Sequence, residues 1–232
     1  ELKRVNPQAD RAGDALRVSI DAKATVHVGP FSRRGRSRTR TKAADHDFKP
    51  KATLTPFGIF LPRYDDLWLY LARSKVTSDF IVDRLEQWWR EVRLRFLHVK
   101  TLVINLDNGP ENHSRRTQFL KRIMGFARKY GLVVQLAYYP PYHSKYNPIE
   151  RCWGILEMHW NGSLLDSIDA VAGFARSMTW KGKHPVVSLV ETTYHKGVRL
   201  KPKEMKALES EVDRLAGLGK WFVKIPAEVQ DG

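Results

Sequence analysis

Three acidic residues stand where carboxylates from separate elements could act together. Asp21 lies on a predicted strand, on the face opposite its main apolar residues. Asp107 follows the apolar run Leu102–Leu106 and opens an Asn-Gly-Pro turn. Glu150 falls in the first turn of a predicted helix, after a proline-rich loop. Ligands of open α/β sheets bind at the carboxyl ends of the strands, and Mg²⁺ prefers oxygen ligands, so these acids are candidate metal ligands.

Such carboxylates suit chemistry at phosphorus. Two Mg²⁺ ions about 3.5–4 Å apart would activate an attacking oxygen and stabilise the leaving oxygen during an in-line displacement. The formal net charge of +15 indicates a polyanionic partner. Acids gathered in a protein of that charge need a metal before they can approach DNA, which agrees with a metal-dependent reaction.

Each acid also has a simpler interpretation. Asp21 would serve equally well as a solvated acid at the end of a strand. Asp107 begins a turn sequence that needs no function. Glu150 lies three residues after Asn147 and would fit a capping box or gain from the helix dipole. Only the three acids together favour the metal hypothesis.

Hydrophobic periodicity predicts the strands that would carry these acids. Apolar and polar residues alternate over residues 15–29, which predicts one strand with Asp21 on its polar side and a second around Thr25–Val28. Further strands are predicted at Phe57–Phe60, Leu67–Ala72, Leu102–Leu106 and Leu132–Ala137. The antiparallel strands come first and alternating α and β follow, which predicts a mixed sheet with helices on both faces.

Three helices are predicted between and after these strands. The first begins at Ser78 or Thr77 and places Trp88 and Trp89 in the core. The second covers roughly Arg115–Tyr130 and ends at Gly131. The third has its cap at Asn147, with Pro148 in the first helical position, and ends near Trp160. Glu157, two turns after Glu150, is expected to be solvated or salt-bridged.

The chain divides into three parts on composition. Residues 1–14 are a polar lead-in, and residues 15–162 form the catalytic core with a basic insert at 31–50. Residues 163–232 form a helical C-terminal extension packed on the core, with at least one strand-like piece at Val186–Val190 and an extended segment at Trp221–Pro226.

The basic insert is a candidate DNA contact. It could be a solvated loop, but the density and single sign of its charge favour a segment that follows phosphates. His143 and Lys145, just ahead of the third acid, are further candidates, with even odds of contacting DNA. The insert contributes six cations within ten positions: Arg33, Arg34, Arg36, Arg38, Arg40 and Lys42.

The amino-acid composition excludes several classes of protein. A hydrophobic content of 42% and an aromatic content of 11% are too high for a disordered chain. The apolar runs are too short for a transmembrane helix. A single cysteine, Cys152, excludes an internal disulfide and a zinc finger, and it is expected to be a packing residue.

The sequence resembles the DDE transposases of insertion sequences over roughly residues 15–226. The resemblance is carried by Val103–Gly109 and by Pro140–Trp153, which contains Asn-Pro-Ile-Glu. Ile20-Asp21-Ala22-Lys23 is similar to the strand of the first acid. Asp45-His46-Asp47-Phe48 and Trp160-Asn161-Gly162 are similar to segments of the Rhodopirellula-type branch.

This resemblance implies an α/β, ribonuclease-H-like fold: a mixed five-stranded sheet, three strands antiparallel and then two parallel, with helices on both faces. It implies that Asp21, Asp107 and Glu150 are catalytic and hold two Mg²⁺ or Mn²⁺ ions. The implied reaction is cleavage at transposon ends and transfer of the 3′-hydroxyl into target DNA. In this interpretation Asn108, Asn112 and His46 support the metal site, although each also fits a plain turn or loop role.

The resemblance also sets expectations about partners. Double-stranded DNA is the expected substrate, and a homodimer or larger synaptic complex is the expected assembly. We expect a bacterial cytoplasmic, nucleoid-associated protein without membrane contact, whose N-terminal DNA-recognition region was removed or lies outside this chain. Two rivals stay open: a ribonuclease-H-like nuclease or resolvase that cuts without joining, and a non-catalytic DNA-binding relic. An RNA-binding module would need an aromatic–glycine sheet motif that the sequence lacks.

Overall fold

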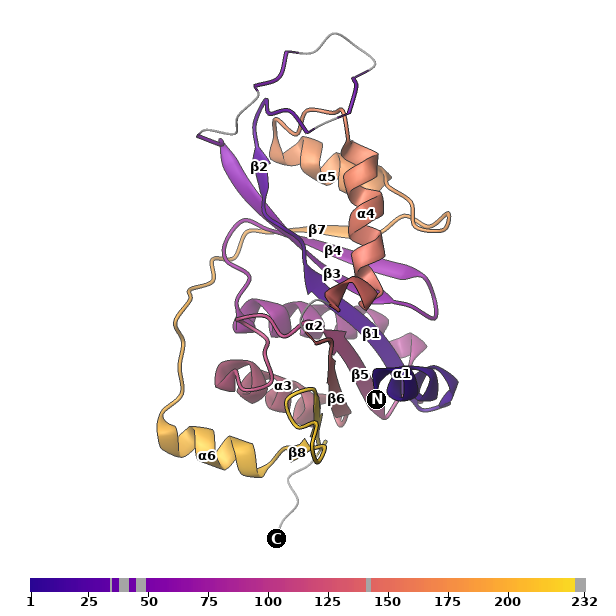
Figure 1. The fold of residues 1–232 in the computed structure, drawn as a ribbon, viewed down its shortest axis with the longest axis vertical. Helices are drawn as coiled ribbons and strands as arrows, with labels where there is room; N and C mark the ends of the chain where they lie inside the picture. Colours follow the sequence, from indigo (N-terminus) through magenta and orange to yellow (C-terminus); the bar gives the residue numbers. More distant parts are fainter. Residues whose placement is uncertain (34, 38–41, 45–48, 141–142, 228–232) are drawn as a thin grey trace.

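The fold, known from a computed structural model, is built on one large mixed sheet (Figure 1). The structure describes residues 1–33, 35–37, 42–44, 49–140 and 143–227. Among these described residues the sheet has nine strands, in the order β7-β4-β3-β1-β5-β6-β9-β8, and β2 pairs with β3 outside that order.

Five strands at the centre reproduce the predicted arrangement. β1 pairs antiparallel with β3, and β3 pairs antiparallel with β4. On its other side β1 pairs parallel with β5, and β5 pairs parallel with β6. The predicted set of three antiparallel and then two parallel strands is therefore confirmed. These strands are β1 (Ala15–Ala22), β3 (Ala52–Leu61), β4 (Asp66–Ala72), β5 (Thr101–Leu106) and β6 (Val133–Tyr138).

Helices cover both faces of the sheet, as predicted, because its strands are apolar on both sides. In β4, Trp68 and Tyr70 pack into a core shared with α2 and α3, whereas Leu67 and Leu69 pack into a core shared with α4 and α5. The bounds of these helices are α2 Ser78–Val92, α3 Thr117–Tyr130, α4 Ile149–Trp160 and α5 Ile168–Ser177.

The ends of α2 and α3 follow the sequence signals. Thr77 caps α2, since its hydroxyl accepts a hydrogen bond from the Phe80 N–H at 3.3 Å. Trp88 and Trp89 are buried in the core, as predicted. α3 ends at Gly131, which takes the left-handed conformation with φ 62°. A short 3₁₀ turn, η1 (Arg93–Arg95), follows α2.

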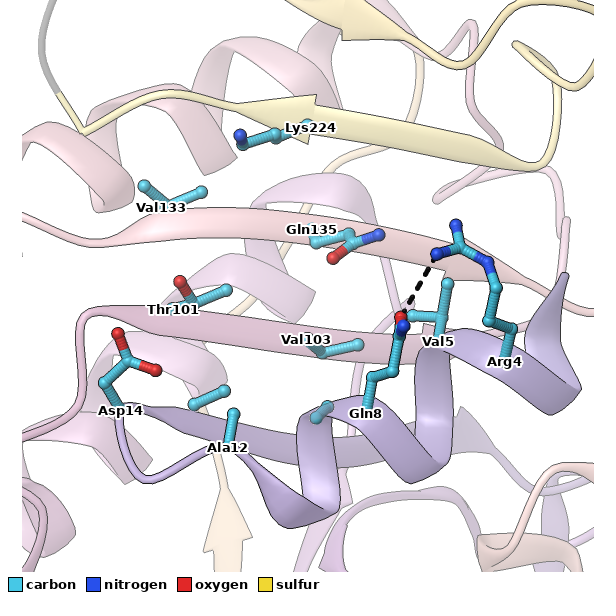
Figure 2. A pocket seen from close by; sticks show the side chains of 12 residues that line it. Arg4, Val5, Gln8, Ala12, Asp14, Thr101, Val103, Val133, Gln135 and Lys224 are labelled. Atoms are coloured by element: carbon cyan, nitrogen blue, oxygen red, sulfur yellow. Dashed lines mark hydrogen bonds between the residues drawn. The ribbon is translucent and has the colours of Figure 1, made fainter.

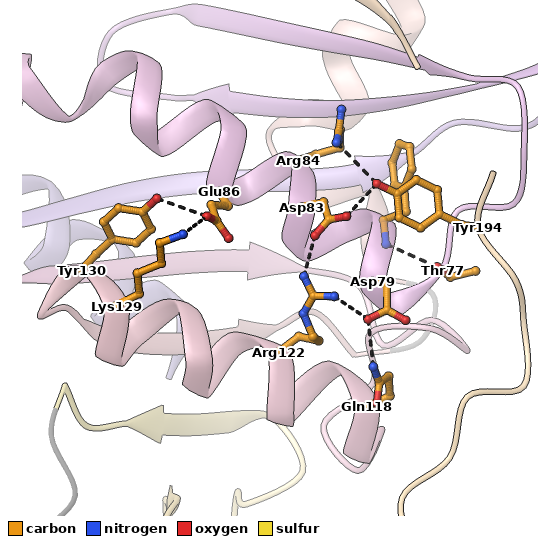
Figure 3. Close-up of polar contacts among 11 residues, drawn as sticks. Thr77, Asp79, Asp83, Arg84, Glu86, Gln118, Arg122, Lys129, Tyr130 and Tyr194 are labelled. Carbon is orange, nitrogen blue, oxygen red and sulfur yellow. Dashed lines mark hydrogen bonds and ion pairs between the residues drawn. The ribbon is translucent and has the colours of Figure 1, made fainter. Parts of the chain in front are cut away.

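A polar network joins α2 and α3 to the segment after β7 (Figure 3). Arg122 of α3 bridges Asp79 and Asp83 of α2, at 2.7 and 2.5 Å. The Tyr194 hydroxyl donates to the other oxygen of Asp83 at 2.7 Å, and Gln118 donates to Asp79. The two helices on this face are therefore held by paired charges as well as by apolar contacts.

Residues 1–14, expected as a polar lead-in, contain a helix, α1 (Leu2–Arg11). Its few apolar residues are spaced so that Val5 and Ala9 are buried against the sheet. The polar side of β1 binds it as well, because Arg17 pairs with Asp10 at 2.7 Å. The sequence prediction missed this helix because only two apolar residues, Val5 and Ala9, form its buried stripe.

The C-terminal extension adds strands to both edges of the sheet, where the expectation was a mainly helical segment. The strand-like piece at 186–190 is β7 (Val186–Val190), which pairs parallel with β4. β9 (Phe222–Ile225) pairs antiparallel with β6 at the far edge, and β8 (Asp213–Arg214) pairs with β9. The remaining elements are β2 (Val26–Val28), η2 (Ser144–Tyr146) and α6 (Pro202–Ser210). Within the described residues, no helix has the length and apolar content needed to span a membrane.

Candidate functional site

The first two acids lie on the same face of neighbouring parallel strands. Ser19 of β1 stands opposite Asn105 of β5 in the register. Two residues further along each strand come Asp21 and Asp107, on the same face because side chains alternate with a period of two. Asp21 is the penultimate residue of β1, and Asp107 directly follows β5. Both acids are therefore at the carboxyl ends of the central strands.

The third acid comes to this edge because the start of α4 is bound to β1. The Ser19 hydroxyl donates to the Asn147 side-chain oxygen at 2.6 Å and accepts the Ile149 N–H at 3.1 Å. The Asn147 amide group donates to the carbonyl of Ile20, the neighbour of Asp21, at 3.1 Å. Asn147 is buried, so these bonds fix the first turn of α4, which carries Glu150, beside the first acid.

These contacts correct the predicted helix cap. Asn147 was expected to cap α4 with Pro148 as its first residue, but Pro148 occupies the cap position and has no capping side chain, and the Ser19 hydroxyl of β1 accepts the first helical N–H instead. The side chain of Asn147 is used by β1 instead. Glu150 therefore has no capping-box partner, which removes one of the simpler interpretations of this residue.

A close packing contact seats α4 against the sheet. Gly58 of β3 stands opposite Asp21 in the register. A Cβ at Gly58 would lie 2.5 Å from Ile149 Cδ1 and 2.8 Å from the Trp153 ring. The absence of a side chain at Gly58 lets α4 approach closely enough for the Trp153 indole N–H to donate to Asp21 Oδ2 at 2.8 Å.

The turn after Asp107 is held in place from several directions. Asn112 donates to Asp107 Oδ1 at 3.0 Å, and the carbonyl of Asn112 accepts from the buried Tyr138 hydroxyl at 2.8 Å. The Asn108 side chain accepts the Ser114 N–H at 3.2 Å, so Asn108 shapes the turn rather than contacting the acid. Asn112 therefore orients Asp107, one of the two roles considered for it from sequence.

The C-terminal extension also reaches this turn. The guanidinium group of Arg214, in β8, donates to the Ser114 carbonyl at 2.7 Å. It also donates to the Gly219 carbonyl at 2.8 Å, within the same terminal hairpin. The segment that carries Asp107 is thus tied to the far edge of the sheet.

Electrostatics shows that the three acids interact with one another. Burial raises the pKa of Asp21 to about 7, and the neighbouring charges of Asp107 and Glu150 add to the rise, against the bond from Trp153. Burial and the charge of Asp107 likewise raise the pKa of Glu150, while Lys23 acts in the opposite direction. Asp21 is half-buried, which excludes the interpretation of a freely solvated strand-end acid.

Carboxylate and amide oxygens are suitable ligands for a hard divalent cation, although the side chains in this structure are not arranged around one. In the described part of the chain, no group of three or more His, Cys, Asp and Glu side chains is arranged to hold a metal ion. Two observations still favour a cation here. Neighbouring carboxylates add to the rise that burial causes in the pKa of Asp21 and of Glu150, and Asn112 Oδ1, beside Asp107, is a buried acceptor without a hydrogen-bond partner among the described atoms. A hydrated cation would offset the negative charge and offer donors to such an oxygen.

The basic insert is anchored on the C-terminal end of α4. Phe31 and Ala44 form a bridge at its base. The Arg33 guanidinium lies 5.2 Å from the centre of the Trp160 ring. Arg36 packs its backbone against Gly162 (a Cβ there would lie 2.7 Å from the Arg36 carbonyl), and Arg36 and Lys42 are exposed. Three other candidate cations and one candidate histidine lie outside the described residues: Arg34, Arg38, Arg40 and His46.

The two remaining DNA-contact candidates lie near the start of α4. His143 and Lys145 are both exposed. The rings of His143 and Tyr146 stack at 5.8 Å, and the Lys145 ammonium lies 5.3 Å from the Tyr146 ring centre. Both therefore lie on the surface in the segment that leads to Glu150.

Sequence reasoning missed the groups that position the acids. Trp153 and Ser19 were not predicted, although a pattern could have pointed to each: Trp153 lies three residues after Glu150, and Ser19 shares the polar face of β1 with Asp21. Lys23 pairs with Glu157 at 2.7 Å, so Glu157 is salt-bridged, as expected. No local signal identifies Gly58, because its role depends on a contact with α4.

A groove of about 470 Å³ lies on the same face but away from the acids (Figure 2). Its walls come from α1 and from β5, β6 and β9, and include Gln8, Thr101, Gln135 and Lys224. Thr101 begins β5 whereas Asp107 follows its end, so the groove and the acids lie at opposite ends of that strand. The groove is therefore no part of the candidate site.

Comparisons with known proteins agree with this geometry. Over residues 1–227 the sequence matches the family described as Rhodopirellula transposase DDE domain. Among solved structures, the chain is similar to the Mos1 transposase paired-end complex with left transposon end, with a TM-score of 0.53 and 11% sequence identity. That match covers 75% of this chain and 49% of the other, so this chain spans about half the length of the Mos1 transposase chain. It confirms the expected ribonuclease-H-like fold, and no curated protein matches the sequence significantly.

Proposed function

Because the chain belongs to the Rhodopirellula transposase DDE domain family, we propose that it is the catalytic domain of a metal-dependent transposase. Its reaction is cleavage of DNA at transposon ends, followed by transfer of the freed 3′-hydroxyl into target DNA. The observation that supports this proposal is that three elements carry Asp21, Asp107 and Glu150 to one sheet edge, where burial raises the pKa of Asp21 and of Glu150 and neighbouring carboxylates add to the rise.

The acids are the groups that would hold Mg²⁺ or Mn²⁺, with two ions as the expected number. When bound, the metal supplies the positive charge that activates the attacking oxygen and stabilises the leaving one. The chain supplies the positions: Trp153 orients Asp21, Asn112 orients Asp107, and the bonds of Asn147 to β1 hold the helix of Glu150.

One site serves both chemical steps because each is a displacement at phosphorus. In the first step water attacks, and the bond to the bridging oxygen breaks to leave a 3′-hydroxyl. In the second step that hydroxyl attacks a phosphodiester of the target, and the broken target strand keeps the displaced hydroxyl. The protein's part is to hold the attacking oxygen and the phosphorus in line, which removes most of the entropic cost of their meeting.

Double-stranded DNA is the proposed partner, in a bacterial nucleoid. Arg36 and Lys42 of the basic insert and Lys145, just before α4, have exposed side chains, and the +15 charge of the chain favours phosphate binding. A homodimer or larger synaptic complex is the proposed assembly, because two transposon ends must be brought together before joining.

Substitution of the second acid tests the assignment. Asp107→Asn keeps the size of the side chain and its bond to Asn112, so we expect the fold and DNA affinity to remain while Mg²⁺-dependent nicking of supercoiled plasmid falls at least about 100-fold. Asp166→Asn makes the same change of charge at an exposed position and should nick like the wild type. Full nicking by Asp107→Asn would defeat the proposal.

A strand-transfer assay separates the transposase from its two rivals. We expect pre-cut duplex ends to be joined to plasmid DNA when Mg²⁺ or Mn²⁺ is present. Nicking without joined products would identify a nuclease or resolvase. DNA binding without any metal-dependent nicking would identify a non-catalytic relic.

A further inference from the structure

The two edges of the sheet differ in a way that matters for assembly. At one edge, β8 is two residues long, Asp213–Arg214, and both residues are charged. Short charged edge strands are a common means of preventing pairing with another chain. At the other edge, β7 is five residues long, Val-Val-Ser-Leu-Val, with neither charge nor proline. In the described part of the chain, nothing pairs with its outer side.

The free hydrogen-bonding groups of β7 can be assigned from one contact. The Val190 carbonyl accepts the Arg73 N–H at 3.2 Å, so Val190 directs its backbone groups toward β4. Successive residues of a strand direct these groups to opposite sides, so Ser188 also faces β4 while Val187 and Leu189 direct theirs outward. Leu189 is 36% exposed and Val186 is 51% exposed, which leaves this edge accessible.

We propose that β7 is a self-association edge, where β7 of a second copy of this chain adds antiparallel across a two-fold axis at Ser188. In that register Val187 lies opposite Leu189 of the partner subunit. Each such pair exchanges two backbone hydrogen bonds, and the two-fold axis doubles the number, so the outward groups of both residues are satisfied. This inference depends on the geometry of β7 and not on the proposed function.

Charge at the ends of β7 favours the same orientation. Lys183, just before the strand, pairs with Asp66 at 2.9 Å and stays 55% exposed, and Glu191, just after it, pairs with Arg73 at 3.3 Å and stays 72% exposed. Antiparallel pairing brings Glu191 level with the basic end of the partner's strand. A second copy is therefore complementary to this edge in hydrogen bonding, and it places the exposed Glu191 of each copy beside the exposed basic end of the other strand, where the existing ion pairs can be shared.

A cysteine at the two-fold axis tests the proposal. Ser188 would face Ser188 of the partner subunit in a non-hydrogen-bonded pair, with Cα atoms about 4.5 Å apart, within disulfide range. We expect Ser188→Cys to form a covalent dimer under mild oxidation at least about tenfold faster than Val186→Cys, its matched control. Val186 is more exposed, but it would lie opposite Val190 of the partner subunit and so cannot cross-link to itself.

Sedimentation of the unmodified chain gives the second measurement. We expect a concentration-dependent dimer. Leu189→Pro should raise its dissociation constant at least tenfold, because proline removes an outward N–H. Leu189→Ala should change that constant by no more than about threefold. Circular dichroism checks that each variant is folded; should Leu189→Pro misfold, the cysteine comparison still decides. The proposal would be overturned if the wild type stayed monomeric, as expected if the edge binds a strand of another protein. Equal cross-linking of the two cysteine variants would overturn it as well. Neither outcome would affect the nicking result.

Discussion

Asp21 is the residue where burial and function conflict most directly. It is half-buried beneath α4, next to two other acids, and accepts one hydrogen bond from Trp153. Its pKa of about 7 means that the metal-free folded protein retains a proton there that an unfolded chain would release near pH 3.8. Stability is therefore lost as the pH rises from the unfolded pKa to the folded one, and it stays low above pH 7.

This sign gives a stability prediction. Between pH 5 and pH 8, without divalent metal, the free energy of unfolding of the wild type should fall by about 2–3 kcal/mol more than that of Asp21→Asn, which resembles the protonated acid. Urea unfolding at both pH values in EDTA measures the difference. A wild type that loses no more stability than Asp21→Asn would contradict the assigned environment of Asp21.

Metal binding should reverse this loss. At pH 8 we expect Mn²⁺ to raise the melting temperature of the wild type, because binding to the folded state alone stabilises it. Asp21→Asn should gain little. An equal gain in both proteins would place the metal elsewhere, and this readout needs no activity.

Sequence reasoning found the acids but not their supports. A carboxylate in a turn or a first helical turn is visible as a residue type, so Asp107 and Glu150 could be selected. Trp153 and Asn147 act through contacts with β1, a strand more than a hundred residues away along the chain. Local patterns therefore predicted a cap for Asn147, whereas the buried hydroxyl of Ser19 and the carbonyl of Ile20 determine its actual use.

At the scale of elements, the docking of α4 on β1 and β3 decides whether the site forms. Periodicity predicted these elements and their order, because both faces of the strands are apolar. It could not predict that α4 would lie so close to β3, since only the missing side chain of Gly58 allows that approach. Helix α1 was missed for a related reason, because its apolar face is short and gains stability from the sheet. Strand β8 was missed because its two residues are both charged and give no periodic signal, whereas β9 lies within the extended segment predicted at Trp221–Pro226.

A pair of glycine substitutions tests this docking. Gly58→Ala should cost about 1–3 kcal/mol and reduce nicking, because its Cβ would meet Ile149 and the Trp153 ring that binds Asp21. Gly154→Ala, in α4 itself, meets nothing within 4 Å and should stabilise the helix by about 1 kcal/mol. Denaturant unfolding measures both effects, and a neutral Gly58→Ala would show that the close approach is unimportant.

At the scale of the whole molecule, described residues of the basic insert contact one end of α4, and Glu150 lies at the other end. Helix α6 lies at the opposite end of the molecule from these residues of the insert (Figure 1). Charge composition predicted the kind of partner from sequence, because net charge needs no knowledge of the fold. The place of the insert beside α4 could be known only from the structure.

Salt dependence tests the role of the insert. Changing Arg33, Arg36 and Lys42 together to alanine should lower DNA affinity. The slope of the logarithm of the binding constant against the logarithm of the salt concentration should become less negative by about 0.9 for each phosphate that the variant no longer neutralises. The same number of cations removed around α6, at Arg199, Lys203 and Lys206, provides a control of equal charge. Equal slopes for the two triple variants would show that the insert plays no special part in DNA binding.

The most direct test of the whole account is a crystal structure of the chain with Mn²⁺, with anomalous scattering used to locate the metal. The account predicts metal peaks coordinated by carboxylate oxygens of Asp21, Asp107 and Glu150, at roughly the 2.0–2.2 Å typical of small divalent cations with oxygen ligands. Metal bound elsewhere, or these three acids facing apart with no metal between them, would contradict the account.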